Sequence, residues 1–379
     1  MTAATTSAMA AMVAELVEIL SGWTGSDGDS SAASRLGDDP AFDRLAMRVH
    51  EAQRDANPTL RRYWELVEAR EPTTWAEVPP VPTSAFRDLA IVAGRAERVF
   101  RTSGTTGGSE RRGEHHVASV ALYRAAARPG YRRHLLGDAG PLRLVSLIPH
   151  PDRAPDSSLS AMAGFIASEP EIIDSTWALD AEQGIDLAGV RRAAESGQPV
   201  LLLATAFSLA HLLDELGDEH APMPEGSRLM ETGGFKGRAT EVKRGELYRR
   251  VGRSLDLDES QIVNEYGMTE LLSQAYDGVA GSAPPLADRC HRFPPWVRTS
   301  ALDPATLVPL PSGEPGLLAH FDLANAASVC PILTEDLGCV LPGRGVRLLG
   351  RAPGAPPRGC SLPAERFSPS NSRERDARV

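Results

Sequence analysis

The chain has 379 residues, of which 42% are hydrophobic and 24% are charged, and its formal net charge is −10 at pH 7. This composition is typical of a globular protein with one large or two ordinary domains, and the acidic balance argues against nucleic acid as a partner. No apolar run approaches the roughly 20 residues of a membrane span, so we expect no membrane partner. The four cysteines show no Cys-x-x-Cys spacing, which excludes a disulfide scaffold and favours a reduced, cytoplasmic setting.

The N-terminal part of the chain is predicted to be mainly helical, because apolar residues recur there at helical spacing. In chain order, the predicted elements are a helix at 6–22, a loop at 23–39, helices within 40–70 broken at Asn57-Pro58, a proline-rich extended stretch at 71–82, a short helix near Phe86, and a strand from about Val92 to Arg101. Gly, Ser, Asp and Pro mark the breaks between these elements.

The middle of the chain alternates apolar strands with helices. The predicted strands are 142–149, 171–174, 199–204, 227–232 and 261–266, and the predicted helices are 118–136, 185–196, 207–216 and 241–254. This alternation indicates an α/β fold with largely parallel sheets. From about residue 285, prolines and glycines increase, and short apolar runs at 296–298, 316–321, 338–341 and 346–349 predict an antiparallel or barrel-like sheet.

These changes in character divide the chain into four predicted parts. They are an N-terminal helical region (1–80), an α/β core (81–284), a smaller β-rich part (285–367) and a polar tail (368–379). The tail is expected to be frayed because it is polar and terminal.

A loop rich in hydroxyl residues and glycines, Thr102-Ser-Gly-Thr-Thr-Gly107, follows one predicted strand. Glycines let successive backbone N–H groups turn toward one point, an arrangement that binds anions. The hydroxyls add donors, and Arg111 and Arg112 add positive charge. The pattern suits phosphate oxygens but lacks the Gly-Lys-Ser/Thr ending of the common P-loop. The alternative is an ordinary surface loop.

Three further polar motifs accompany predicted strands. They are Glu231-Thr-Gly-Gly-Phe-Lys-Gly237, Asn264-Glu-Tyr-Gly-Met-Thr-Glu270 and Leu333-Thr-Glu-Asp-Leu-Gly338. Ligands of open α/β sheets bind at the carboxyl ends of strands. We therefore expect the hydroxyl-rich loop and the first two of these motifs to lie at such ends, where one ligand can contact them.

Three of these stretches, Thr102–Gly107, Glu265–Glu270 and Thr334–Gly338, resemble the signature motifs of the adenylate-forming superfamily of acyl-CoA synthetases, luciferases and nonribosomal adenylation domains. The closer similarity is to the LuxE-like acyl-protein synthetases, the fatty-acid-activating component of bacterial bioluminescence reductase complexes. It rests on residues 231–237, on Pro151-Asp-Arg-Ala-Pro-Asp-Ser-Ser-Leu159 and on Arg358-Gly-Cys-Ser-Leu362, and it covers roughly residues 80–365.

The resemblance implies a fold and a two-step reaction. The implied fold is an α/β core of mostly parallel sheets flanked by helices plus a smaller barrel-like sheet, without the mobile C-terminal lysine domain of full-length members. A carboxylate attacks the α-phosphorus of ATP to give an acyl-adenylate and pyrophosphate, and a nucleophile then takes the acyl group. The implied cofactors are ATP and Mg²⁺. The implied partners are a carboxylic acid and an acceptor, for which an acyl carrier protein, a reductase and CoA are alternatives.

The resemblance also assigns roles to residues of this chain. The pyrophosphate is assigned to Ser103, Gly104, Thr105, Thr106 and Gly107, with charge from Arg111 or Arg112. The adenine slot is assigned to Gly233, Gly234 and the Glu265-Tyr266-Gly267 run, with Tyr266 stacking on the base. Thr269 contacts the α-phosphate, Glu270 holds Mg²⁺, Asp336 binds the ribose hydroxyls, and Arg351 touches ribose or phosphate. In isolation, a core tyrosine is the favoured explanation of Tyr266 and a turn residue that of Asp336, whereas the set of motifs together favours the functional roles.

Two catalytic assignments depart from the full-length pattern. Lys236 is our candidate in cis for the lysine of the absent domain, and a solvated turn lysine is the alternative. Cys360 has a basic neighbour, Arg358, and positive surroundings raise the thiolate fraction of a cysteine. The family resemblance implies an acylated cysteine here, and a small buried cysteine is the alternative.

Other residues near these motifs have weaker assignments. His116 and His150 are candidates for substrate or phosphate contacts. Acyl-pocket lining or simple helix packing explains Ser157, Ser158, Met162 and Phe165 equally.

The leading prediction is therefore ATP-dependent activation of a carboxylic acid through an acyl-adenylate, with transfer to the thiol of Cys360, a carrier protein or CoA. Three alternatives remain open at this point. They are a nucleotide-binding subunit without turnover, an amide ligase with a small amine acceptor, and a thioester acyltransferase that uses Cys360 without ATP.

Overall fold

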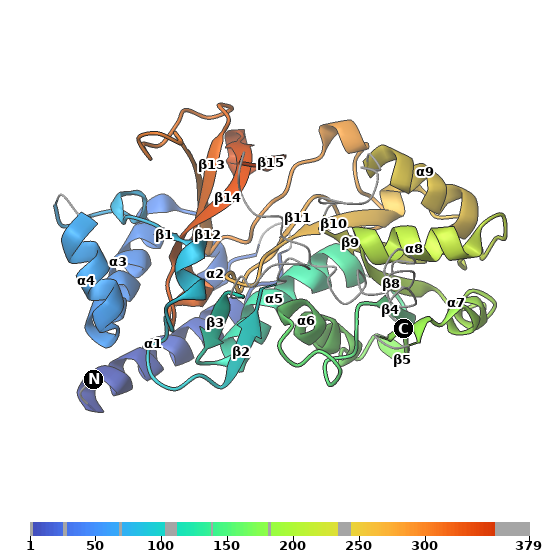
Figure 1. Cartoon of the computed structure of the whole chain (residues 1–379), viewed down its shortest axis with the longest axis horizontal. Coiled ribbons are helices and arrows are strands. Elements are labelled where there is room, and N and C mark those ends of the chain that lie inside the picture. The colour runs from blue at the N-terminus through green and yellow to red at the C-terminus, as the bar shows by residue number, and fades with distance from the viewer. Residues whose placement is uncertain are drawn as a thin grey trace, which may run out of the picture.

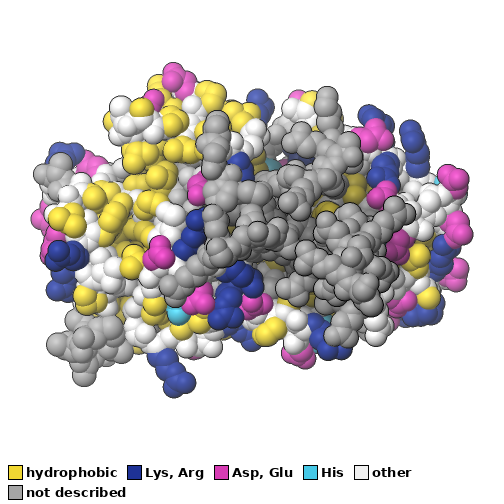
Figure 2. Space-filling model, viewed as in Figure 1, with side chains coloured by type: hydrophobic (Ala, Val, Ile, Leu, Met, Phe, Trp, Pro, Cys, Tyr) yellow, Lys and Arg dark blue, Asp and Glu magenta, His cyan; other side chains and the backbone are white. Residues whose placement is uncertain are grey.

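The computed structural model describes residues 3–25, 29–67, 70–102, 112–137, 139–180, 183–233 and 244–352, without the side chains of residues 3–6. A larger sheet with its helices forms one end of the molecule, and a smaller sheet packed with the N-terminal helices forms the other (Figure 1). Figure 2 shows hydrophobic side chains gathered over the end with the smaller sheet, whereas charges of both signs are interspersed over the end with α8 and α9.

Within the described part of the chain, the larger sheet has six strands in the order β11-β10-β9-β8-β4-β5. The parallel strands are β4 (Leu142–Leu147), β5 (Ile172–Trp177), β8 (Val200–Thr205), β9 (Arg228–Thr232) and β10 (Ile262–Tyr266). β11 (Ala275–Tyr276) runs antiparallel to β10. All residues of β8 and β10 are buried, as expected for a parallel sheet with both faces covered. The predicted α/β fold is confirmed.

Helices cover both faces of this sheet. On one face, α7 (Leu187–Ala194), α8 (Ala206–Leu216) and α9 (Arg244–Leu255) share a hydrophobic cluster with the strands. On the other face lie α5 (Val120–Tyr131), its π-helical continuation Arg132–Leu136, and α6 (Ser158–Ala167). The hydroxyl of Thr205 accepts a hydrogen bond from the Ser208 backbone in a capping box, which starts α8 directly after β8.

The smaller sheet is mainly antiparallel and lies in the C-terminal part of the chain. Its strands are β1 (Val81–Pro82), β12 (Val297–Leu302), β13 (Gly316–Asp322), β14 (Pro331–Val340) and β15 (Val346–Arg351). They pair in the order β1-β14-β13-β12, with β15 also on β14, and only the β1–β14 pair is parallel. The predicted antiparallel sheet is thus present, and the Asp336 motif lies within β14.

The N-terminal helices share a hydrophobic core with this smaller sheet. These helices are α1 (Ala3–Ser21), α2 (Ala32–Arg35), α3 (Asp39–Ala56) and α4 (Pro58–Val67). One cluster contains Phe42 of α3 and Trp64 of α4 together with Trp296, Phe321 and Ile332. Residues from opposite ends of the sequence therefore build one core.

The prediction that the hydroxyl-rich loop follows a strand of the parallel sheet is wrong. β2 (Arg98–Arg101) pairs with β3 (Glu114–Val117) in a separate two-stranded antiparallel ribbon, and not with the parallel sheet. The loop therefore connects the two strands of a hairpin instead of following a strand of the main sheet. Antiparallel strands need only a short connection, whereas parallel strands need a crossover, and the polar sequence of β3 gave no strand signal.

The other differences from the predicted elements are local. Val92 lies outside any strand, and Gly184–Ile185 forms a short strand, β7, paired with β6 (Leu179–Asp180), so the helix expected at 185 begins at Leu187. A short helix near Phe86 is confirmed as the 3₁₀ turn Thr83–Arg87. No helix among the described residues is both long and apolar enough to cross a membrane.

Candidate functional site

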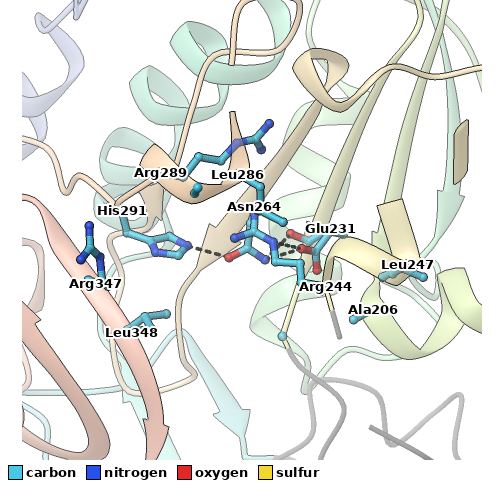
Figure 3. Close-up of a pocket in the computed structure, with 12 residues that line it drawn as sticks. Ala206, Glu231, Arg244, Leu247, Asn264, Leu286, Arg289, His291, Arg347 and Leu348 are labelled. Atoms are coloured by element: carbon cyan, nitrogen blue, oxygen red, sulfur yellow. Dashed lines mark hydrogen bonds and ion pairs between the residues drawn. The ribbon is translucent and has the colours of Figure 1, made fainter. Parts of the chain in front are cut away.

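The carboxyl ends of β9 and β10 border a pocket of about 480 Å³ (Figure 3). The pocket lies between these strand ends, the first turns of α8 and α9, and β15 of the smaller sheet. Its lining residues are Ala206, Glu231, Gly233, Arg244, Leu247, Asn264, Leu286, Ala287, Arg289, His291, Arg347 and Leu348. The positions of the motifs at 231–237 and 264–270 predicted a ligand site at this edge of the parallel sheet. The structure has a concave site there.

A buried carboxylate forms the polar floor of this pocket. The Nδ2 atom of Asn264 donates to Glu231 Oε1 at 2.7 Å, and the Tyr248 hydroxyl donates to the same oxygen at 3.0 Å. Arg244 lies 3.3 Å from it as an ion pair. Burial raises the pKa of Glu231, and Arg244 opposes this rise. Figure 3 shows Glu231, Asn264 and Arg244 converging from two strands and one helix.

The same network fixes the orientation of Asn264. His291 Nε2 lies 2.6 Å from Asn264 Oδ1, so the imidazole donates to the amide oxygen while the amide nitrogen donates to Glu231. Burial lowers the pKa of His291 to about 4, which keeps its ring neutral. Asp277 accepts from the backbone of Asn264 at 2.8 Å and pairs with Arg244. The pocket wall is therefore held by a connected set of buried hydrogen bonds.

Two glycines shape the strand ends at this edge. Gly233 lines the pocket with φ +80°, a conformation that favours glycine. A Cβ on Gly267 would lie 2.3 Å from Glu265 Oε1. The Glu265 carboxyl is buried and accepts a hydrogen bond from the Thr232 hydroxyl, and burial raises its pKa to about 7. The structure therefore places the Glu265 side chain inside the fold and leaves Gly233 at the pocket surface.

Asp336, Tyr266 and Arg351, which lie far apart in the sequence, are brought together. The Tyr266 hydroxyl donates to Asp336 Oδ2 at 3.0 Å. Asp336 on β14 lies opposite Arg351 on β15, with Arg351 Nε 3.9 Å from Asp336 Oδ1. Arg351 also pairs with Glu335. The Tyr266 ring contacts His291, a lining residue, with ring centroids 5.9 Å apart, so this carboxylate lies close to the pocket.

His320 supports this arrangement and was missed from the sequence. Its Nε2 lies 3.2 Å from the Tyr266 oxygen, and its Nδ1 lies 2.9 Å from the Thr299 hydroxyl. Because the Tyr266 hydroxyl donates to Asp336, His320 Nε2 must carry the proton, and Nδ1 accepts from Thr299. Burial lowers the pKa of His320 to about 4. In the sequence it stands in an apolar run, where nothing distinguishes it from a packed core residue.

The turn after β10 carries Thr269 and Glu270. His115 on β3 lies with Nδ1 2.7 Å from the Thr269 carbonyl oxygen and Nε2 3.0 Å from the Ser328 hydroxyl. Burial lowers the pKa of His115 to about 4. Thr269 is half-buried and Glu270 is buried, and the Glu270 carbonyl accepts from Asn325 Nδ2 at 2.7 Å. The β2–β3 ribbon is thus joined to the predicted α-phosphate and metal residues.

Arg112 lies at the base of the β2–β3 hairpin. Its Nε donates to the Thr102 carbonyl at 2.5 Å, and its guanidinium pairs with Asp156 at 3.1 Å. The nearby residues predicted as substrate contacts have local roles: His116 pairs with Glu114, and His150 Nδ1 accepts from the Asp152 backbone. Ser157 caps α6, and Met162 lies in the core, as the packing alternative expected.

Several predicted site residues lie outside the described residues. They are Ser103, Gly104, Thr105, Thr106, Gly107, Arg111, Gly234, Lys236 and Cys360. The described pocket adds residues for which the sequence gave no signal. These are Arg244 at the start of α9, Arg289 and His291 in the segment between β11 and β12, and Arg347 on β15.

The solved structures similar to this chain show its fold. A 2-hydroxyisobutyryl-CoA ligase in complex with 2-HIB-AMP and CoA superimposes with a TM-score of 0.59 at 19% identity, covering 85% of this chain and 68% of that chain. An open conformation of the same ligase gives 0.58 at 18% identity, covering 83% and 74%. These likenesses show that the chain has the fold of this ligase.

The sequence comparisons identify the family. The model for the acyl-protein synthetase LuxE matches residues 71–367. The long-chain-fatty-acid–luciferin-component ligase of Vibrio harveyi is 25% identical over 313 residues, which cover 76% of this chain and 77% of the relative. The ligase of the same name from Aliivibrio fischeri is 25% identical over 309 residues, again covering 76% and 77%.

The chain belongs to the LuxE acyl-protein synthetase family. It is accordingly an acid–thiol ligase, which uses ATP to activate a carboxylic acid as an acyl-adenylate and transfers the acyl group to a thiol. The resemblance found in the sequence is confirmed.

Proposed function

We propose that the pocket edge binds ATP with its base near Gly233 and its ribose at Asp336. The observation that supports this assignment is the convergence of three distant motifs, 231–233, 264–270 and 334–336. A carboxylate accepts hydrogen bonds from both ribose hydroxyls, and Arg351 lies beside that carboxylate as an ion-pair partner. Asp336 can bind ribose and still accept from Tyr266, because each carboxylate oxygen has two acceptor sites.

The phosphate contacts of this proposal come from two segments. Thr269 contacts the α-phosphate through its hydroxyl, and residues 103–107 hold the β- and γ-phosphates. Lys236 is proposed to supply positive charge near the α-phosphate and the acid. Arg112 is assigned to the base of the phosphate loop, because its guanidinium pairs with Asp156 and the Thr102 carbonyl.

Mg²⁺ is proposed to enter with ATP and to be held by Glu270. No group of three or more His, Cys, Asp or Glu side chains among the described residues is arranged to hold a metal ion. This suits Mg²⁺, which usually binds through one or two carboxylates and the phosphates of a nucleotide instead of a protein cage. The metal neutralises charge on the phosphates, and the protein supplies a single hard oxygen ligand.

The first step of this reaction predicts exchange of labelled pyrophosphate into ATP that depends on an added carboxylic acid. We expect exchange with one class in a panel of short, branched, aromatic and long-chain acids, with long-chain fatty acids tested first because the relatives are named for them. The rate is measured at saturating ATP with and without Mg²⁺. Binding of ATP without exchange for any acid would instead favour a nucleotide-binding subunit without turnover.

The second step is proposed to place the acyl group on Cys360, from which a carrier protein, a reductase or CoA takes it. After incubation with ATP, Mg²⁺ and the active acid, mass spectrometry should show a gain equal to the mass of the acid minus water. We expect this gain to disappear in Cys360→Ser, while pyrophosphate exchange stays within about threefold of wild type, because the thiol acts after adenylate formation.

Cys290→Ser is the matched control, because Cys290 is a partly exposed cysteine outside the proposed site. It should retain the full mass gain. Cys330 is buried and its thiol pKa is raised, which disfavours the reactive thiolate. A gain that persists in Cys360→Ser would contradict the assignment, and adenylate formation without any gain would point to an external thiol or amine acceptor.

A further inference from the structure

His115 contacts two segments that each lie more than 150 residues away from it in the sequence. Its ring is fully buried and stands edge-on to Phe86, with ring centroids 5.5 Å apart. Nδ1 contacts the Thr269 carbonyl oxygen at 2.7 Å, and Nε2 contacts the Ser328 hydroxyl at 3.0 Å, across separations of 154 and 213 residues. Both ring nitrogens are therefore used, each on a different segment.

The two contacts fix which nitrogen carries the proton. A carbonyl oxygen can only accept a hydrogen bond, so Nδ1 must be protonated and donates to Thr269. Nε2 of the neutral ring is then an acceptor. The Ser328 hydroxyl donates to it at 3.0 Å, and the Asn325 carbonyl oxygen, 3.2 Å away, is a second acceptor for the same proton. The serine thus favours the one tautomer that can hold the Thr269 backbone.

The two segments joined by His115 are each anchored on their own side. At the base of the β2–β3 hairpin, the Thr102 backbone N–H donates to the Gly113 carbonyl at 2.9 Å, and the Gly113 N–H donates to the Thr102 hydroxyl at 2.9 Å. On the other side, Asn325 holds the carbonyl of Glu270 and accepts from the Leu272 backbone. His115 is the side chain that links these two anchored parts.

We propose that His115 is a positioning residue, which fixes the Thr269 turn against the β2–β3 hairpin through its Nδ1–H bond. This inference rests on the proposed contact between Thr269 and the α-phosphate. A shift of this turn moves the Thr269 hydroxyl relative to the reacting phosphorus, and misplacement by about 1 Å can reduce a rate about 100-fold. Because the α-phosphate changes geometry during adenylate formation, the effect falls on kcat more than on the KM for ATP.

Two amide substitutions separate the two contacts. In His115→Asn, the amide nitrogen is as many bonds from Cβ as Nδ1 is, so it can still donate to Thr269. In His115→Gln, the amide nitrogen takes the place of Nε2 and reaches toward Ser328. We expect the kcat of acid-dependent pyrophosphate exchange to fall about 10-fold to 100-fold in His115→Gln, and to stay within about threefold in His115→Asn. The KM for ATP should change little in either variant.

Ser328→Ala tests the same link with a smaller change. It removes the hydroxyl that favours the tautomer, together with the contact of that hydroxyl with the Asn325 carbonyl oxygen, and we expect kcat to fall about threefold to tenfold. His50→Gln is the control for loss of a buried histidine. His50 is buried against Trp64 among the N-terminal helices, with ring centroids 4.4 Å apart. That variant should lower the melting temperature and leave kcat unchanged.

The outcomes are distinguishable. Equal kcat values for folded His115→Gln and His115→Asn, or a wild-type kcat in Ser328→Ala, would overturn the positioning role while wild-type exchange still supports the proposed function. A wild-type enzyme that shows no exchange with any acid would overturn both. The inference is supported if kcat is low in His115→Gln and close to wild type in His115→Asn, while the melting temperatures of the two variants are lowered equally.

Discussion

Asp336→Ala should reduce kcat/KM for ATP in acid-dependent pyrophosphate exchange by roughly 10²-fold to 10⁴-fold. The carboxylate is placed to accept two hydrogen bonds from ribose, and a hydrogen bond to a charged group contributes about 1.5–3 kcal/mol. Removal of Asp336 also frees Arg351 and the Tyr266 hydroxyl, which are its partners in the structure. Asp336→Asn should reduce kcat/KM for ATP by a smaller factor, because asparagine keeps the shape of the side chain and one acceptor oxygen.

Glu314→Ala is the matched control for this prediction. Glu314 is an exposed carboxylate just before β13, where the neighbouring Gly313 pairs with Val340, four residues beyond Asp336 on β14. Glu314→Ala changes the net charge by the same amount as Asp336→Ala. It should nevertheless leave pyrophosphate exchange within about twofold of wild type, as expected for an exposed surface charge. Urea unfolding of all three variants separates lost binding from lost structure. Wild-type exchange in folded Asp336→Ala would show that ribose binds elsewhere.

Arg244→Met should reduce the free energy of unfolding by about 3–5 kcal/mol, because it leaves a buried carboxylate without its cation. Arg244 pairs with Glu231 at 3.3 Å and with Asp277, and both carboxylates are buried. Arg289 remains 3.6 Å from Asp277, so the loss falls mainly on Glu231. The measurement is urea unfolding, compared with Arg249→Met. Arg249 forms an exposed pair with Glu246 on the same helix, which contributes about 0–1 kcal/mol.

The reduction in the free energy of unfolding caused by Arg244→Met should also depend on pH. Burial raises the pKa of Glu231 in the folded state, and Arg244 is the main group that lowers it. Without Arg244 the folded-state pKa rises further above the unfolded value. A group with a raised folded pKa stabilises the fold below its unfolded pKa and loses this contribution as pH rises through the folded pKa. The difference in the free energy of unfolding between variant and wild type should therefore grow as pH rises above the ordinary range of a glutamate carboxyl, and a difference independent of pH would contradict this explanation.

The main sheet could be predicted from the sequence because its strands are short apolar runs between helices of clear periodicity. The position of β3 could not, because Glu114 and the two histidines after it are polar and the strand forms only through pairing with β2. The motif at 264–270 was placed correctly at the end of a strand, since β10 is fully buried up to Tyr266.

The candidate site was predicted only in part, because strand register and long-range hydrogen bonds leave no local signal. Asp336 and Arg351 were named from motifs, but that they stand opposite each other depends on the pairing of β14 with β15, which contains a bulge. His115 and His320 act through both ring nitrogens on distant segments. Such roles follow from tertiary packing and not from spacing along the chain.

The shared core of the N-terminal helices and the smaller sheet also determines when this enzyme can finish folding. Gln53 of α3 donates to the carbonyl groups of Asn325, Ala326 and Ser328, which are 272–275 residues further along the chain. During synthesis the helices leave the ribosome first and must keep their apolar faces covered until β13 and β14 emerge. Contacts this distant in sequence slow folding and prolong the exposure of apolar surface. The strand that carries Asp336 is therefore among the last parts of the shared core to be secured during synthesis.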